Sequence, residues 1–215
     1  MAASITQTNL ETFREAIMDD DVTVLCGAGI SSIPPTSLPL GDHLRDLCVA
    51  TLLSDAANES LIQQILHSPS YQALLPEVVL QFIGSLLSRE LDAFMSKVLR
   101  SRPPNAAHQA IAANFKHIYT TNFDLCLQEA GATRVNHLHG SIASRHSLQN
   151  RIFRLGKTAQ KANASFLKTL PQRPLVVLGY SLRDEDVISA LIQNPPLSIY
   201  YLSFDGSMPA AARRI

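Results

Sequence analysis

The residues of this chain that could do chemistry fall into four short polar motifs, each placed directly after an apolar run. They are Gly27-Ala28-Gly29, Asn122-Phe123-Asp124, His139-Gly140 and Gly179-Tyr180-Ser181. Glycines allow a backbone to turn sharply and approach a ligand, so that its N–H groups can hold a phosphate. An amide, a carboxylate and an imidazole can orient a water molecule or a sugar hydroxyl and can move a proton. The motifs therefore indicate a site for a phosphate-bearing ligand with acid–base groups beside it.

The first motif continues to Ser32 and follows an apolar, β-branched run over residues 22–26. Its pattern is G-x-G-x-x-S, with Ser32 where the dinucleotide-binding fingerprint has Gly or Ala. That fingerprint also needs an acidic residue about 20 positions later, at the end of a second strand. Asp42 and Asp46 are nearby, but they lie in a stretch that is expected to be helical. An ordinary NAD dehydrogenase fold is therefore disfavoured, and a tight turn without a ligand is the alternative interpretation of the glycines.

The elements that must position these motifs are the strands of a parallel sheet. Short apolar or β-branched runs predict strands over 22–26, 117–120, 134–138, 174–178 and 198–202. In an open parallel sheet, ligands bind beyond the carboxyl ends of the strands. We therefore expect an α/β fold, with a Rossmann-like parallel sheet flanked by helices in three layers and all four motifs at one sheet edge.

The sequence between the first two strands is helical almost throughout. Apolar side chains recur at helical spacing to about residue 100, and prolines punctuate the segments. A crossover between parallel strands needs only about a dozen residues. We therefore interpret residues from about 42 to 102 as an inserted helical subdomain, within one domain that spans 1–215. The proline-rich segment 33–39 is either a flexible lid over the site or an ordinary ordered connection.

The composition excludes several classes of protein. Hydrophobic residues make up 46% of the chain and charged residues 17%, which is enough apolar material for a core. The formal net charge is zero, so no basic surplus indicates nucleic-acid binding. The apolar runs are too short for a membrane span, and no signal peptide is visible. Cys26, Cys48 and Cys126 form no C-x-x-C pair, which favours a cytoplasmic protein whose cysteines are small buried side chains and argues against a structural zinc site.

In combination, the four motifs resemble those of the Sir2 (sirtuin) superfamily. That family pairs a G-A-G-I-S loop with a T-Q-N-x-D motif, an H-G catalytic histidine and a late G-x-S loop. The matching stretches here are Gly27-Ala-Gly-Ile-Ser31, Thr120-Thr-Asn-Phe-Asp124, His139-Gly140 and Gly179-Tyr-Ser181, and Pro103-Pro-Asn-Ala-Ala-His108 resembles the family's P-x-x-x-H helix start. The resemblance covers residues 22 to 186, which is most of the chain.

Two departures separate this sequence from the protein deacylases of that family. Ser32-Ile-Pro-Pro-Thr-Ser37 replaces the deacylase motif G-I-P-D-F-R, so its Phe and Arg are absent. The four zinc-binding cysteines after H-G are also missing, because no cysteine follows Cys126. These departures, with T-T-N-F-D and G-Y-S-L-R-D, resemble the Sir2-like proteins of prokaryotic antiphage defence, which hydrolyse NAD⁺ to nicotinamide and ADP-ribose.

The resemblance implies that NAD⁺ is the substrate and that the chain is an NAD⁺ glycohydrolase. The catalytic residues would then be His139, which activates water or a ribose hydroxyl, Asn122, which orients water or ribose, and Asp124, which accepts from a ribose hydroxyl or the carboxamide. The residues expected to bind NAD⁺ are Gly27, Ala28, Gly29, Ile30, Ser31, Thr121, Asn122, Asp124, Gly179, Tyr180 and Ser181.

Each catalytic candidate also has a purely structural interpretation. Asp124 could cap the short helix that begins at Leu125, Asn122 could form a turn, and His139 could be an ordinary loop histidine. His137 is a rival to His139, because strand alternation should point both side chains the same way.

Four further polar residues near the motifs are expected to have structural roles. His108 is expected to pack beside the pocket, and Asn105 to cap its helix. Asp184 and Asp186 are expected to be acids that favour the start of a helix.

Two other functions remain open at this point. One is a zinc-independent, NAD-dependent protein deacylase, and the other is a non-catalytic module that senses NAD⁺ or ADP-ribose for a partner. An enzyme that destroys NAD⁺ must be held inactive in a healthy cell, so we expect a homo-oligomer or a partner defence protein or domain. The ending at Ile215, just after a predicted core strand, is consistent with a longer protein.

Overall fold

The parallel sheet predicted from the apolar runs is present in the computed structural model, which describes residues 13–15, 21–55, 57–100, 102–143 and 157–202. Within those residues the sheet comprises β1 (Thr23–Cys26), β2 (His117–Thr120), β3 (Val135–His137), β4 (Leu175–Leu178) and β5 (Ile199–Leu202), in the order β3-β2-β1-β4-β5. All four strand pairs are parallel. The strand predictions are confirmed to within one residue at each end.

The register of the sheet brings the motifs to one edge. Cys26 at the end of β1 is paired with Thr120 on one side and Leu178 on the other. Because these three strands end at the same level, the residues immediately after them meet in space. Strand β1 lies at the centre, and its four residues are all buried, which explains their continuous apolar or β-branched character.

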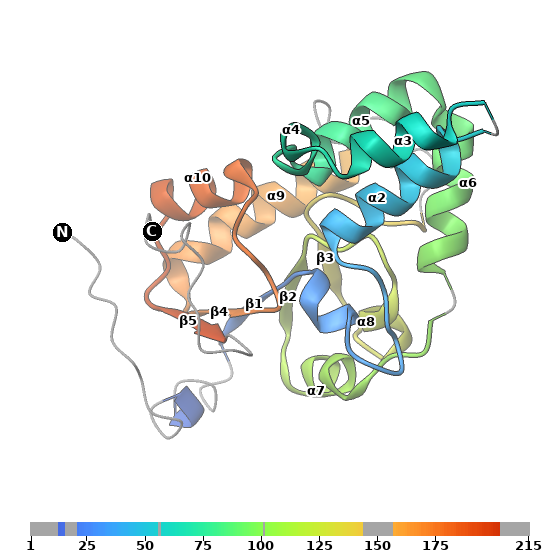
Figure 1. Cartoon of the computed structure of the whole chain (residues 1–215). Helices are drawn as coiled ribbons and strands as arrows, with labels where there is room; N and C mark the ends of the chain where they lie inside the picture. Colours follow the sequence, from blue (N-terminus) through green and yellow to red (C-terminus); the bar gives the residue numbers. More distant parts are fainter. Residues whose placement is uncertain (1–12, 16–20, 56, 101, 144–156, 203–215) are drawn as a thin grey trace.

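Helices cover both faces of the sheet, as the α/β interpretation requires. The helices and 3-10 turns around the sheet are η1 (Ala28–Ser31), α7 (Ala106–Asn114), α8 (Cys126–Glu129), α9 (Lys157–Thr169), η2 (Leu170–Gln172) and α10 (Glu185–Gln193). Leu25 of β1 packs with residues of α9 and α10, whereas Val24 and Cys26 pack with residues of α7 and α8. Figure 1 shows these two pairs of helices on opposite sides of the strands. Residues 13–15, which precede β1, are helical.

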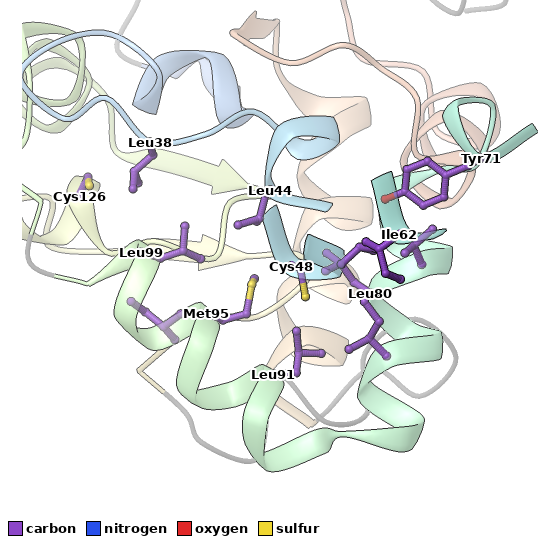
Figure 2. Close-up of a cluster of buried hydrophobic side chains, with 14 residues drawn as sticks. Leu38, Leu44, Cys48, Ile62, Tyr71, Leu80, Leu91, Met95, Leu99 and Cys126 are labelled. Carbon is purple, nitrogen blue, oxygen red and sulfur yellow. The ribbon is translucent and has the colours of Figure 1, made fainter. Parts of the chain in front are cut away.

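Five helices follow one another between β1 and β2, in the segment interpreted as an insertion. They are α2 (Gly41–Leu52), α3 (Glu59–Leu66), α4 (Pro69–Gln72), α5 (Pro76–Leu86) and α6 (Ser88–Leu99). We call residues 41–99 the helical lobe. Its helices share a buried cluster that includes Cys48, Leu80 and Met95 (Figure 2). The apolar stripes therefore supply the core of the lobe, although some of their residues are exposed, among them Val78, Phe82 and Leu86. In the described part of the chain, no helix is both long enough and apolar enough to cross a membrane.

A buried arginine holds the helical lobe together. The Arg45 side chain is 0% exposed, and its Nε donates to Asp46 Oδ1 at 2.8 Å. Its two other nitrogens donate to the Leu74 carbonyl oxygen at 2.6 Å and to Gln72 Oε1 at 3.1 Å. The guanidinium also lies 4.6 Å from the centre of the Tyr71 ring. Because its donors are matched by several acceptors, this charge can be buried, and it ties α2 to the segment around α4.

The proline-rich segment 33–39 is an ordered connection rather than a free lid. Thr36 is fully buried, and its hydroxyl donates to the Pro103 carbonyl oxygen at 2.7 Å. Asn105 Nδ2 donates to the carbonyl oxygens of Ile30 and Ile33, at 2.8 and 3.1 Å. These bonds fix both ends of the turn after β1 against the start of α7. Of the two interpretations of this segment, the structure supports the connection.

Candidate functional site

A cavity of about 480 Å³ lies at the carboxyl edge of the sheet, between the strand ends and the helical lobe. All the site residues predicted from the sequence line it except Gly27 and Ile30, which are not among its lining residues. The helical lobe contributes the opposite wall, which includes Asp42 and Glu77. Polar groups that follow four strands therefore meet in one cavity, at the sheet edge where the four motifs were expected to lie.

The two glycine turns of the site pack directly on each other. The Gly29 N–H donates to the Gly179 carbonyl oxygen at 2.8 Å, and the Gly27 N–H donates to the Leu178 carbonyl oxygen at 3.0 Å. A Cβ on Gly29 would lie 2.8 Å from Gly179 Cα, and one on Gly27 would lie 2.7 Å from Tyr180 Cα. The glycines are therefore required by the contact between the two turns. The Gly29 N–H, one of the backbone groups expected to hold a phosphate, therefore already donates its hydrogen bond to Gly179.

Ser31 is the centre of a buried polar network. Its Oγ donates to Asp124 Oδ2 at 3.0 Å and accepts from Asn122 Nδ2 at 3.1 Å. His108 Nε2 lies 3.1 Å from the same oxygen. These four side chains are each at most 8% exposed. The hydroxyl of Ser31, predicted to contact NAD⁺, thus holds Asn122 and Asp124 in place at the wall of the cavity.

The direction of the hydrogen bonds shows that this network is not a Ser-His-Asp nucleophile. The backbone N–H of Asn105 donates to His108 Nδ1 at 3.2 Å, completing a capping box at the start of α7. Nδ1 is therefore the acceptor, and the neutral ring carries its proton on Nε2, which donates to Ser31. Burial lowers the pKa of His108, although the charge of Asp124 acts against this change. His108 cannot take the Ser31 proton in this arrangement. It has the structural role expected from the sequence, in which it packs beside the pocket.

Asp124 has the capping role that the sequence left open and a second role as well. Its Oδ1 accepts from the Cys126 N–H at 3.0 Å at the start of α8, while Oδ2 accepts from Ser31. The carboxylate is 7% exposed and lines the cavity. Both oxygens are fixed, so its negative charge has a defined position beside Asn122.

His139 lines the cavity, and its imidazole is paired with an acid. Its Nε2 lies 3.3 Å from Asp186 Oδ2, and its side chain is 15% exposed. Burial alone would lower the pKa of His139, but the Asp186 hydrogen bond and the charges of Asp184, Asp186 and Glu77 raise it. Burial alone would raise the pKa of the Asp186 carboxyl, but the hydrogen bond to His139 and the charge of His139 lower it. Asp186 is thus more than an acid at a helix start.

His137 does not share the cavity with His139, contrary to the prediction from strand alternation. Its Nδ1 lies 2.7 Å from the Asn122 carbonyl oxygen, and its Nε2 lies 2.6 Å from Gln128 Nε2. Strand β3 ends at His137, and the chain then turns, with the Gly140 N–H donating to the His137 carbonyl oxygen at 3.3 Å. The two-residue alternation of a strand therefore stops between the two histidines. His137 holds the backbone of Asn122.

Comparison with known proteins identifies the architecture. No protein-family model matches the sequence, and no curated protein matches it. A solved Sir2 homolog–NAD complex is similar over 98% of this chain and 88% of its own, with a TM-score of 0.59 and 17% identity. Sir2Tm bound to a propionylated peptide is similar over 94% of this chain and 89% of its own, with a TM-score of 0.57 and 16% identity. The chain has the Sir2 fold.

A third solved structure agrees with this identification. Sir2 in complex with the inhibitor EX-527, 2′-O-acetyl-ADP-ribose and deacetylated p53 peptide is similar over 93% of this chain, with a TM-score of 0.57 and 16% identity, and the match covers 88% of that chain. The resemblance drawn from the four motifs is therefore confirmed at the level of the fold.

Within the Sir2 fold, the described residues place three potential metal ligands together, and they are His108, Asp124 and Cys126. Their ligand atoms lie within 4.8 Å of one another, and all three residues are buried. Burial and the charge of Asp124 raise the pKa of the Cys126 thiol, which keeps it protonated. Asp124 already accepts two hydrogen bonds and His108 donates to Ser31. Because these groups already take part in internal hydrogen bonds and the thiol is protonated, the three residues fit a structural network better than a metal site.

Sequence reasoning missed the residues that the helical lobe brings to the cavity of this Sir2 fold. Glu77, at the start of α5, lines the wall, and burial together with the charge of Asp184 raises the pKa of its carboxyl. Asp42 Oδ2 accepts from Arg183 Nη1 at 2.9 Å, which joins the lobe to the turn after β4. These residues belong to amphipathic helices whose sequence gives no sign of a site, so no local signal could have identified them.

Proposed function

We propose that this chain is an NAD⁺ glycohydrolase that cleaves NAD⁺ to nicotinamide and ADP-ribose. The observation that carries the proposal is that Asn122, Asp124 and His139 line one cavity between two glycine turns at the carboxyl edge of a Sir2 fold. A similar solved structure is a Sir2 homolog–NAD complex, which supports NAD⁺ as the substrate. The cavity volume of about 480 Å³ falls in the usual range for small-molecule sites, about 300–1,000 Å³.

The chemistry of the bond suits these residues. Cleavage of the nicotinamide–ribose bond proceeds through an oxocarbenium-like state, as in glycoside hydrolysis. The bonding electron pair leaves with nicotinamide, which becomes neutral, so no strong general acid is needed. Water adds to the ribose carbon, and His139 takes the water proton. The negative charge of Asp124 stabilises the positive ribose, and Asn122, anchored on Ser31, orients the water or a ribose hydroxyl.

The proposed binding residues divide between the two glycine turns. Because the Gly29 N–H is engaged with Gly179, we assign the diphosphate contacts of the first turn to Ala28, which lines the cavity. Ser181 in the second turn is proposed to donate to the diphosphate or the adenosine ribose. Thr121 and Tyr180 complete the proposed wall around NAD⁺.

One specific observation favours a second candidate, an NAD-dependent protein deacylase. Similar solved structures include Sir2 bound to acetylated peptide, at 15% identity and a TM-score of 0.55. An acylated peptide is therefore the second reactant to test. The lack of any cysteine after Cys126 in the sequence and the replaced G-I-P-D-F-R motif favour the glycohydrolase instead.

The decisive experiment is chromatography of NAD⁺ incubated with the purified protein, with and without an acetylated peptide. We expect nicotinamide and ADP-ribose without peptide, and a fall of at least about 10²-fold in His139→Ala and Asn122→Ala. His67→Ala is a matched control, because His67 is exposed and its ring contacts the Gln63 carbonyl oxygen of its own helix. Product that requires peptide, with deacetylation, would replace the proposal by the deacylase. Saturable NAD⁺ or ADP-ribose binding without product would replace it by the sensor.

We further propose that the activity serves antiphage defence in the cytoplasm by depleting NAD⁺, with a homo-oligomer or a partner defence protein holding it in check. The departures from the deacylase motifs support this assignment. A bacterial host that expresses the chain should lose NAD⁺ on infection with a phage that triggers it, and should keep NAD⁺ when it expresses His139→Ala. Equal NAD⁺ content in both hosts across a broad phage panel would remove the defence role.

A further inference from the structure

The contact between His139 and the first turn of α10 goes beyond the residues assigned above. Asp186 is the second residue of α10, and its Oδ2 lies 3.3 Å from His139 Nε2 across a separation of 47 residues in the chain. Its other oxygen, Oδ1, accepts from the Val187 N–H at 2.9 Å. The carboxylate is therefore anchored on the helix start and presents one oxygen to the histidine.

The protonation of this pair follows from its chemistry. The contact with His139 lowers the pKa of Asp186, so it is a carboxylate at neutral pH and can only accept. Nε2 of His139 must then carry the proton of that hydrogen bond. In the neutral ring, Nδ1 is left with the lone pair, so it is the nitrogen that can accept a proton from a substrate or water.

We propose that Asp186 is the positioning residue of the site, which fixes the tautomer of His139 with Nε2–H toward the carboxylate and leaves Nδ1 as the base. This inference rests on the proposed function for its catalytic meaning. The arrangement follows the logic of an acid that orients a catalytic histidine and stabilises its protonated form. The proton that Nδ1 takes from water gives an imidazolium, whose charge is balanced by Asp186 while the ribose cation is attacked.

The neighbouring acids have different roles from Asp186. Asp184 Oδ2 accepts from the Tyr180 hydroxyl at 2.6 Å, so this carboxylate is held by another partner and acts on His139 through its charge. Glu77 acts on His139 from the helical lobe, also through its charge. Among these acids, Asp186 makes the hydrogen bond to the ring, and the removal of its charge and the removal of its oxygen can be tested separately.

The experiment uses the full chain without substrate first, by ¹H–¹⁵N NMR of the imidazole nitrogens. We expect the wild type to show the Nε2–H tautomer of His139. In Asp186→Asn, the pKa of His139 should fall by about one unit or more, because a charge in hydrogen-bond contact is lost. Glu185→Gln removes a charge from the same helix turn and is the matched control, in which the tautomer and the pKa of His139 should not change.

Steady-state kinetics of NAD⁺ hydrolysis then test the positioning role of Asp186. In Asp186→Asn the acidic limb of the kcat profile should move to lower pH with the pKa of His139. In Asp186→Ala, kcat should fall by about 10²-fold or more with little change in KM, and Asp186→Glu should restore part of it. An Nδ1–H tautomer in the wild type, or an unchanged pKa of His139 in Asp186→Asn, would overturn the inference. The NMR result stands without turnover, so a protein that hydrolyses no NAD⁺ refutes the proposed function alone.

Discussion

At the scale of single residues, the site depends on a few buried side chains that hold others in place. Ser31 contacts Asn122, Asp124 and His108 through one oxygen. His137 contacts the backbone of Asn122. The residues that would face the substrate are therefore oriented by groups behind them, and such support is a common requirement of a rigid active site.

Replacement of Ser31 tests this support. In Ser31→Ala, Asn122 Nδ2, His108 Nε2 and Asp124 Oδ2 each lose a buried partner, which should lower the free energy of unfolding by at least about 2 kcal/mol. Urea denaturation measures this loss. Ser32→Ala is the control, because the Ser32 hydroxyl donates one bond, to the Gly29 carbonyl oxygen at 2.8 Å. It should cost about 1 kcal/mol. Equal losses in the two variants would show that the network is not cooperative.

The His139–Asp186 pair predicts a pH dependence of stability. The folded-state pKa of His139 is raised above 6.5, so its contribution is complete below that pH and is lost as pH rises through the folded pKa. The folded-state pKa of Asp186 is lowered below 3.8, so its contribution is complete above that pH and is lost as pH falls through the folded pKa. The pair should therefore stabilise the protein most between these two values.

Denaturation of wild type and Asp186→Asn at several pH values checks this expectation. The difference in the free energy of unfolding should be larger near pH 5.5 than near pH 9, by about 1.4 kcal/mol for each unit by which Asp186 raises the pKa of His139. A difference that is constant over this range would contradict the coupling. Glu185→Gln, in the same turn of α10, should show no such trend.

At the scale of elements, the site is built where two turns after parallel strands pack backbone against backbone. Gly179 has a φ of +59°, and a Cβ there would lie 2.5 Å from the Ile30 nitrogen. Such a contact cannot be relieved by rotating a side chain, because the atoms on the other side belong to the main chain of η1. The close approach of the turns after β1 and β4 therefore requires glycine for two independent reasons.

Two alanine substitutions separate these reasons. Gly179→Ala should destabilise the protein by more than about 3 kcal/mol, since it adds a clash to an unfavourable φ. Gly131→Ala adds only the unfavourable φ, because Gly131 has a φ of +99° and no atom within 4 Å of the added Cβ. Its cost should be about 1–2 kcal/mol. Urea denaturation compares the two, and similar losses would mean that the turns can separate at little cost.

At the scale of the whole molecule, the helical lobe and the sheet together enclose the cavity. The Asp42–Arg183 ion pair joins them at a partly exposed position, with side chains 48% and 59% exposed. On α5, Val78, Phe82 and Leu86 are 48%, 62% and 62% exposed and recur at helical spacing. An apolar stripe of this kind is typical of a surface that contacts another chain.

The prediction of a homo-oligomer is tested by light scattering. We expect a mass that is a multiple of the 23.5 kDa chain, and a lower mass in Phe82→Glu, because a charge on the exposed stripe of α5 opposes contact between copies. Ser85→Glu is the control for added charge on the same helix, at an exposed position beside the stripe. A single mass of one chain at every protein concentration would contradict the prediction.

The amino-acid sequence by itself determined the strands, the four motifs and the sheet edge on which they meet. These features depend on local patterns. Short apolar runs form buried parallel strands, and parallel strands that end at one level bring the loops after them together. The capping of α7 by Asn105 was predictable for the same reason, since a cap depends on residues within one turn.

Only the tertiary structure decided how those groups are used. It engaged the Gly29 N–H with Gly179, placed Ser31 at the centre of a network and separated His137 from His139. It also brought Asp186 to His139 across 47 residues. Each of these outcomes is a contact set by the packing of whole elements or by the point at which a strand ends, so no local spacing encodes it.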